Sequence, residues 1–181
     1  MTLREGDKQA LIKYRIERSI EAIDEAKMAY ESNHLNLAVN RNYYACFYSI
    51  KALLLTKDID YSDHGHVKGE FNKEFVHKGL VDKDYTKILE NAFQQRQIGD
   101  YRDLIKFNKE GVKSSIKKAE EFVTEINKMT LKFTNKQEIE NKQEATSTNL
   151  KNSESPKPDS FTQDPQNKPE IKPEIKRKFR R

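Results

Sequence analysis

The 181-residue chain has no tryptophan, a single cysteine, and no proline before Pro156. One cysteine excludes an internal disulfide framework and fits a reducing cytoplasm. No apolar run approaches the roughly 18 residues that a membrane span needs. The first residues, MTLREGDKQ, are charged and contain no apolar signal core. These absences predict a cytoplasmic protein without a membrane segment.

Several catalytic and ligand-binding motifs are also missing. The sequence has no glycine-rich phosphate loop, no paired cysteines, no His-Glu-x-x-His and no nucleophile elbow. Its four histidines do not combine with cysteine or with closely spaced acids at metal-ligand spacing; they are His34, His64, His66 and His77. We therefore expect neither a metal site nor a cofactor.

The prolines divide the chain unevenly. All five lie at or after Pro156, where Lys, Glu, Asn, Gln, Ser and Thr dominate. Such a composition cannot bury enough apolar area to offset the entropy of ordering. We predict a folded helical domain over residues 1–133 and a disordered polar tail over 134–181. The tail ends in KRKFRR, which either attracts phosphates in a salt-dependent way or is a solvated end.

The organising feature of the folded part is the stretch 36–55, NLAVNRNYYACFYSIKALLL. It carries only Arg41 and Lys51 as formal charges, in a chain that is 35% charged. Apolar residues lie on most sides of its helical projection, which is typical of a helix buried by its neighbours. We expect a central helix here, capped at its start by Asn36.

The other helices are predicted from three- and four-residue apolar spacing. A first amphipathic helix covers about 7–32, with Tyr14 and Ile20 in its apolar face. A short helix follows over 66–78 and stops at Gly79. Longer ones cover about 83–101, after a cap at Asp82, and the stretch beginning at an Asn108 cap. The fold class is all-α: an antiparallel up-and-down bundle of four long helices plus one short helix.

A line of polar residues crosses the central helix, because positions three and four apart share a face. Two interpretations stay open. Tyrosine rings can pack in the core while their hydroxyls reach water or partners. Alternatively, the line is a stacking and hydrogen-bonding wall that binds a base or nucleotide; its candidate ligand-binding residues are Asn40, Arg41, Tyr44 and Tyr48.

Two further groups offer chemistry. Arg96 and Asp100 are four residues apart, so they form either an intrahelical ion pair or a functional pair next to an apolar face. The stretch Asp63-His64-Gly65-His66 contains histidines that serve either as caps of a nearby helix end or as general acid–base groups near neutral pH. Sequence alone leaves both alternatives open.

Three blocks resemble the HEPN domain family over roughly residues 11–129. The first is NRNYYACFY with KALLL in the central helix; the second is His64 ahead of Phe71 and Phe75; the third is Phe93, Arg96, Asp100 and Tyr101. The resemblance is to stand-alone HEPN proteins associated with nucleotidyltransferases. It implies an all-α bundle, a homodimer, and a place in a prokaryotic toxin–antitoxin-like system with a minimal nucleotidyltransferase as partner.

The family resemblance also implies a metal-independent endoribonuclease, whose motif is an Arg, four to six residues and then a His, assembled at a dimer interface. Arg96 matches the arginine, but the residues after it, QIGDYRD, contain no histidine. The candidate catalytic set is therefore Arg96 with Asp100, Tyr101 or His64. The alternative hypothesis is a non-catalytic accessory protein that binds a nucleotide or the partner nucleotidyltransferase.

Overall fold

The computed structural model describes the backbone of residues 4–101 and 106–152, with side chains except at 100, 101, 138 and 141–152. The chain divides into two units, residues 1–143 and 144–181. All helices that build the candidate site belong to the first unit. The described part of the second unit is the helical stretch 144–152.

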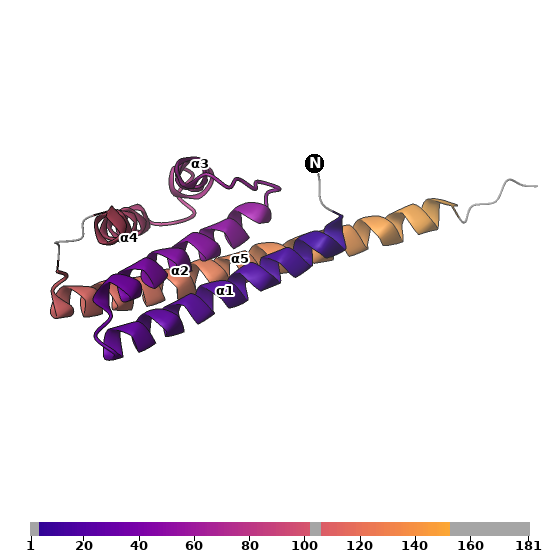
Figure 1. Cartoon of the computed structure of the whole chain (residues 1–181). Helices are drawn as coiled ribbons and strands as arrows, with labels where there is room; N and C mark the ends of the chain where they lie inside the picture. Colours follow the sequence, from indigo (N-terminus) through magenta and orange to yellow (C-terminus); the bar gives the residue numbers. More distant parts are fainter. Residues whose placement is uncertain (1–3, 102–105, 153–181) are drawn as a thin grey trace, which may run out of the picture. The chain divides into compact units, whose positions relative to one another are not determined.

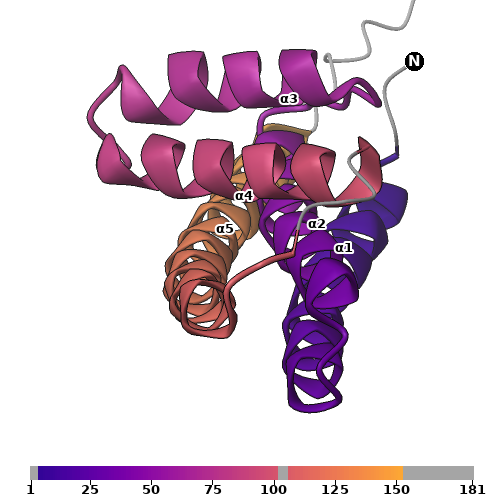
Figure 2. The same cartoon turned by 60° about the vertical axis from the view of Figure 1, so that its left-hand side comes forward.

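The described ranges contain helices and no strand, which confirms the predicted all-α bundle. The elements are α1 (Glu5–Glu31), α2 (Leu35–Leu55), α3 (His64–Phe71), the π-helical turn η1 (Asn72–Val76), α4 (Asp84–Tyr101) and α5 (Lys109–Asn152). Figure 1 shows α1, α2 and α5 running alongside one another. Figure 2 shows α3 and α4 lying side by side across these three helices.

Helix directions follow from the contacts between them. Lys27 of α1 pairs with Glu120 of α5, and Ser19 of α1 accepts a hydrogen bond from Asn127, so α1 and α5 are antiparallel. Asn42 of α2, in contrast, contacts Ser115, and Thr56 at the end of α2 accepts a hydrogen bond from Gln137, so α2 and α5 run in the same direction. The α3–α4 pair makes this possible because it returns the chain across the bundle (Figure 2).

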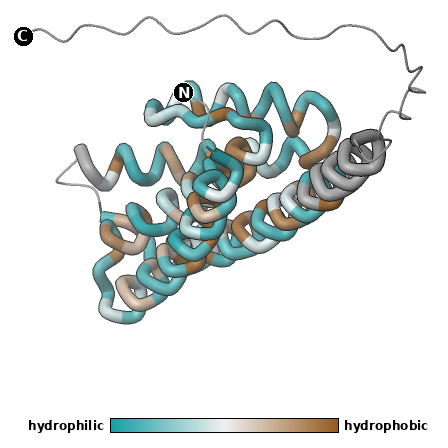
Figure 3. Tube along the Cα trace, turned by 90° about the vertical axis from the view of Figure 1, so that its right-hand side faces the viewer, coloured by the Kyte–Doolittle hydropathy of each residue, from teal (hydrophilic) through white to brown (hydrophobic). Residues whose placement is uncertain are grey.

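Helix α2 is the buried centre of the fold, as its apolar composition predicts. Its side chains and those of the surrounding helices form one large apolar cluster. Figure 3 shows hydrophobic positions recurring along the helices between more numerous hydrophilic ones. The largest fully buried side chains include Phe71, Phe75, Phe122, Ile50, Leu53 and Leu54.

The predicted apolar face of α1 is wrong in part. Tyr14 and Ile20 are 54% and 50% exposed. The buried line instead includes Lys8 and Arg15, which are buried together with Ile12 and Ser19. Arg15 is compensated by Asp60, to which Nη2 donates at 2.8 Å, so a partner in the loop between α2 and α3 makes burial of the charge tolerable.

Helix boundaries also test the predicted caps. The Asn36 cap is wrong: α2 begins at Leu35 after His34, which makes no side-chain capping bond. Asn33 has a φ of +60°, so the chain reverses earlier than the apolar pattern indicates. Gly79 has the expected positive φ, +69°. Asn108 accepts a hydrogen bond from the Gly111 N–H as predicted, with 3.1 Å between the atoms.

The last helix continues past the predicted domain boundary at residue 133. Thr134 is buried, and Gln137 donates a hydrogen bond to the carbonyl of Thr56 at 2.7 Å. Adding residues to a formed helix avoids the cost of nucleation, and Lys, Glu and Gln are good helix formers. The boundary remains a prediction, and residues 153–181 of the predicted tail lie outside the described part.

Candidate functional site

The centre of the candidate site is Tyr43 of α2, a residue that the sequence analysis did not single out. Tyr43 is 2% exposed, and its hydroxyl lies 2.7 Å from Nδ1 of His64 in a shared hydrogen bond. The two rings are 5.5 Å apart, centre to centre. A buried phenol with a polar partner satisfies the requirement that buried hydroxyls be hydrogen-bonded.

His64 is positioned by the start of α3. Asp63 is the N-cap, and its carboxylate accepts the backbone N–H of His66 at 2.9 Å. This fixes the first turn, in which His64 is the first helical residue. The His64 ring then packs against Phe47 of α2, with 4.5 Å between ring centres. The short helix therefore begins two residues earlier than predicted, and the earlier start brings His64 to α2.

Arg96 of α4 reaches the same tyrosine. Its guanidinium carbon lies 5.6 Å from the centre of the Tyr43 ring and 5.5 Å from that of Tyr44. Both distances are within the range of a cation–π interaction. The structure thus brings together Arg96 and His64, which are far apart in sequence, around the side chain of Tyr43.

A hydrogen-bond chain holds α4 at this place. Asn42 of α2 donates to the Ser115 hydroxyl at 3.0 Å, and that hydroxyl donates to Oε1 of Gln95 at 2.8 Å. Gln95 directly precedes Arg96. The chain therefore links α2, α5 and α4 next to the candidate catalytic arginine, and its members have no periodic signal that sequence reasoning would find.

The surroundings of His64 and Tyr43 set the protonation states of these two side chains. Burial lowers the pKa of His64, and the positive charges of Arg96 and Lys51 lower it further against the opposing effect of Asp63. Burial raises the pKa of Tyr43 above its ordinary value, although Arg96 opposes this. At neutral pH, His64 is therefore a neutral imidazole and Tyr43 a neutral phenol. A neutral imidazole is able to accept a proton.

The predicted polar line of α2 lies beside this pair. Arg41 stacks its guanidinium carbon 5.4 Å from the centre of the Tyr44 ring, pairs with Glu25 at 3.3 Å and donates to Oδ1 of Asn40 at 2.9 Å. The next tyrosine along the line, Tyr48, has the guanidinium of Arg18 over its ring. The line is therefore continuous with the Arg96 site through Tyr44.

Two other predicted catalytic residues are not placed. Asp100 and Tyr101 form the end of α4, and their side chains lie outside the described part of the chain. His66, the neighbour of His64, is largely exposed and pairs with Asp63 at 2.9 Å. The structure therefore distinguishes the two histidines of the DHGH stretch: His64 faces the candidate site, whereas His66 is bound to the carboxylate of the capping residue Asp63.

A small cavity adjoins His64. It measures about 60 Å³ and is lined by His64, Gly65 and Lys68 together with apolar side chains of α2 and α4: Tyr43, Phe47, Ile50, Leu89 and Phe93. Room for little more than water, in mostly apolar surroundings, keeps one side of the imidazole poorly solvated. This explains the lowered pKa of His64 through burial.

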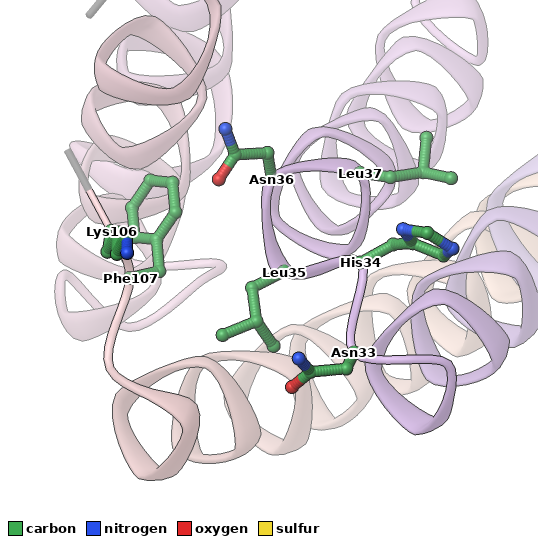
Figure 4. A pocket seen from close by; sticks show the side chains of 7 residues that line it. All are labelled: Asn33, His34, Leu35, Asn36, Leu37, Lys106 and Phe107. Atoms are coloured by element: carbon green, nitrogen blue, oxygen red, sulfur yellow. The ribbon is translucent and has the colours of Figure 1, made fainter. Parts of the chain in front are cut away.

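A larger hollow lies at the turn between α1 and α2. In Figure 4, Lys106 and Phe107 lie on one side of the α2 start, whereas His34 and Leu37 point to its other side. Its lining therefore does not converge on one point. Polar groups that act on a substrate must converge, so we place the site at Arg96 and His64 instead.

The described ranges contain neither a cluster arranged as a metal site nor a helix suited to a membrane span. No group of three or more His, Cys, Asp or Glu side chains there is arranged to hold a metal ion. Cys46 is fully buried, and burial raises its pKa to about 12, so it remains a thiol. None of the described helices is both long and apolar enough to span a membrane.

The fold and the site define a class: an all-α bundle domain with an arginine and a histidine gathered around a buried tyrosine of its central helix. The chain belongs to the HEPN domain family, whose model matches residues 12–129. The resemblance noted in the sequence is thereby confirmed, and the match covers every residue of the candidate site.

Individual relatives agree with this assignment. The chain is 42% identical over 124 residues to a Thermotoga maritima protein named "UPF0332 protein", covering 68% of this chain and 94% of the relative. Two Methanocaldococcus jannaschii proteins bear names beginning "Putative toxin". They are 33% and 37% identical over 113 residues, with 62% of this chain covered and 77% and 84% of the relatives.

Proposed function

We propose that this chain is a toxin-like HEPN protein of a prokaryotic toxin–antitoxin system, which binds RNA at Arg96 and His64 and cleaves it without a metal ion. The observation that carries the proposal is the convergence of Arg96 and His64 on Tyr43, at 5.6 Å and 2.7 Å. The names of the two Methanocaldococcus jannaschii relatives support the toxin-like role.

The chemistry follows from the two side chains. Neutral His64, whose Nδ1 is held by Tyr43, accepts the proton of a ribose 2′-hydroxyl through Nε2. The 2′-oxygen attacks the adjacent phosphorus and the bond to the 5′-oxygen breaks, giving a 2′,3′-cyclic phosphate. The leaving oxygen takes a proton from water. The Arg96 guanidinium stabilises the charge that develops on the phosphate oxygens.

In this mechanism, His64 takes the role of the histidine that is missing after Arg96. The family motif has its histidine a few residues after the arginine, whereas here His64 comes from α3. A histidine held from another element serves equally well if its geometry is fixed, since catalysis depends on position and not on sequence order. The Asp63 cap and the Tyr43 hydrogen bond provide that fixation.

The test is cleavage of labelled RNA by the purified full chain in EDTA. Arg96→Ala and His64→Gln are each expected to lower the cleavage rate by about a hundredfold or more. His66→Gln is the matched control: it removes a histidine two residues away, whose side chain is 71% exposed, and leaves the rate unchanged. Products should end in a 2′,3′-cyclic phosphate.

A second candidate function is the non-catalytic one: an accessory protein that binds a nucleotide or a partner nucleotidyltransferase. It is favoured by the packing of His64, whose ring contacts Phe47 and whose Nδ1 is already engaged by Tyr43. Absence of cleavage on every RNA, with co-purification of a nucleotidyltransferase or a nucleotide-dependent rise in Tm, would establish this function instead. The expected homodimer and cytoplasmic location belong to both proposals.

A further inference from the structure

Beyond the Arg96 site, α1 and α2 carry a second set of stacked arginines and tyrosines. Arg18 of α1 lies 5.7 Å from the centre of the Tyr48 ring, as Arg41 lies 5.4 Å from that of Tyr44. The two tyrosine rings are 6.2 Å apart and inclined by 35°. We call these four residues the tyrosine row. It begins at the site itself, because Arg96 also contacts Tyr44.

We propose that the tyrosine row binds the unpaired nucleotides of a single-stranded RNA next to the phosphate held by Arg96. This inference rests on the proposed function and names its substrate class. Tyrosine faces stack on bases of any sequence, and arginines contact the phosphates between them. Bases inside a duplex keep their faces covered, so only single-stranded RNA is able to use such a row.

The hydroxyls of the row support ligand binding. Tyr44 and Tyr48 are both partly exposed, unlike buried Tyr43, and neither hydroxyl makes a hydrogen bond to another described residue. These hydroxyls are able to bond to a ligand in place of water. Each residue therefore combines an aromatic ring with a hydroxyl that a base is able to engage.

Two carboxylates lie beside the tyrosine row, and carboxylates repel the phosphates of RNA. Glu21 pairs with Arg18, and Glu25 lies 3.3 Å from Arg41 and 3.9 Å from Arg18. All of these pairs are partly exposed, and exposed pairs contribute little. A phosphate is therefore able to replace Glu25 as the partner of both arginines. Removing the Glu25 charge should consequently strengthen RNA binding, which a purely structural row would not show.

The experiment measures affinity for single-stranded oligonucleotides of two lengths, about 4 and about 12 nucleotides, by fluorescence anisotropy. The full chain carries His64→Gln so that the RNA stays intact. Tyr48→Leu and Arg18→Gln are expected to weaken binding of the long RNA by about tenfold and to leave the short RNA unaffected. Arg18→Gln should also reduce the slope of log K against log salt by about 0.7.

Three variants complete the design. Tyr48→Phe keeps the ring and should retain most of the affinity. Glu25→Gln should raise affinity for the long RNA several-fold. Glu17→Gln is its control, since Glu17 lies on the same helix but pairs with Lys13; it should change nothing.

The outcomes separate this inference from the proposed function. Affinity that does not depend on RNA length, equal binding of a duplex, or a change of oligomeric state in Arg18→Gln with unchanged RNA affinity would overturn the tyrosine row. Cleavage of a dinucleotide by the wild-type chain would still support the proposed function in that case. Conversely, length-dependent binding that Tyr48→Leu abolishes, in a chain that cleaves no RNA, supports the row and refutes the nuclease.

Discussion

The hydroxyl of Tyr43 and Nδ1 of His64 lie 2.7 Å apart, and this contact joins the central helix to the start of α3. It matters for the site because His64 is fixed by residues on both sides: Asp63 caps its helix, and Phe47 packs on its ring. An imidazole held in this way presents Nε2 as its remaining nitrogen. The contact also gives the site a measurable energetic signature.

Tyr43→Phe should lower the free energy of unfolding by about 1 kcal/mol, the usual contribution of a partly buried hydrogen bond. The ring remains, so packing against Phe47 and Phe93 is retained. Urea unfolding measures the change. Tyr14→Phe is the matched control because Tyr14 is 54% exposed, and it should change stability little. Equal losses in both variants would show that the Tyr43 hydroxyl contributes nothing specific.

The pKa of His64 predicts how stability depends on pH. Burial and the nearby Arg96 hold this pKa below its ordinary value, so the unfolded chain binds a proton more readily than the folded one. The stability associated with neutral His64 is therefore fully present above about pH 6.5 and is lost as pH falls toward the lower folded pKa. Thermal unfolding between pH 5 and 8 should show this loss, and His64→Gln should reduce it.

The lowered pKa of His64 can also be measured directly by NMR, and the charges around the ring predict how it changes. Lys51 lowers the pKa of His64, so Lys51→Met should raise it. Lys68→Met serves as the comparison: Lys68 also lines the small cavity, but it is not among the charges that shift the His64 pKa, so this variant should change that pKa little. Titration of the His64 ring protons measures both. An unchanged pKa in Lys51→Met would contradict the electrostatic explanation.

Asp60 links the loop before His64 to α1. Its carboxylate accepts a hydrogen bond from Nη2 of Arg15 at 2.8 Å and pairs with Lys51 at 3.1 Å. Although burial opposes it, these two cations hold the pKa of Asp60 below its usual range. Asp60→Asn should cost about 2 kcal/mol in unfolding free energy, because the Arg15 side chain is only 9% exposed and loses its counter-charge.

The control for Asp60 is Asp7→Asn, which breaks the exposed Arg4–Asp7 pair. It should cost less than about 0.5 kcal/mol, as exposed pairs do. The difference between wild type and Asp60→Asn should shrink at low pH, since the stability from a lowered carboxyl pKa is present above the unfolded value and is lost on acidification. A cost that persists unchanged at low pH would point to packing rather than charge.

Truncation tests where the folded part ends. Removing residues 153–181 should leave Tm unchanged. Removing 134–181 should cost about 1–2 kcal/mol, because it also removes buried Thr134 and the hydrogen bond from Gln137 to the Thr56 carbonyl. Thermal and urea unfolding of the two truncated chains measure this. Identical stability would place the boundary at residue 133, where the change in composition puts it.

The basic end KRKFRR is removed in both truncated chains, which allows its role to be measured too. If it attracts phosphates, both truncations should weaken RNA binding and reduce its salt slope. If it is a solvated end, neither quantity changes. Comparison with Arg18→Gln then separates tail binding from binding at the tyrosine row.

The sequence by itself determined the fold class and the burial of the central helix. Residues 36–55 are apolar on most sides, and such a helix has no stable place except among neighbours. The stop at Gly79 and the helix start at Asn108 were also predicted from the sequence, because a positive φ and a capping side-chain carbonyl are local requirements. The family could also be predicted, since its blocks keep their order along the chain.

Only the tertiary structure decided which residues meet. Arg96 and His64 belong to helices that cross the bundle, and their convergence on Tyr43 depends on how α3 and α4 lie against α2. Arg15 is buried among apolar residues of α1 because its counter-charge, Asp60, comes from a distant loop. Helical periodicity reports which side of a helix is apolar, but the partners that make a polar residue stable inside come from elsewhere in the chain.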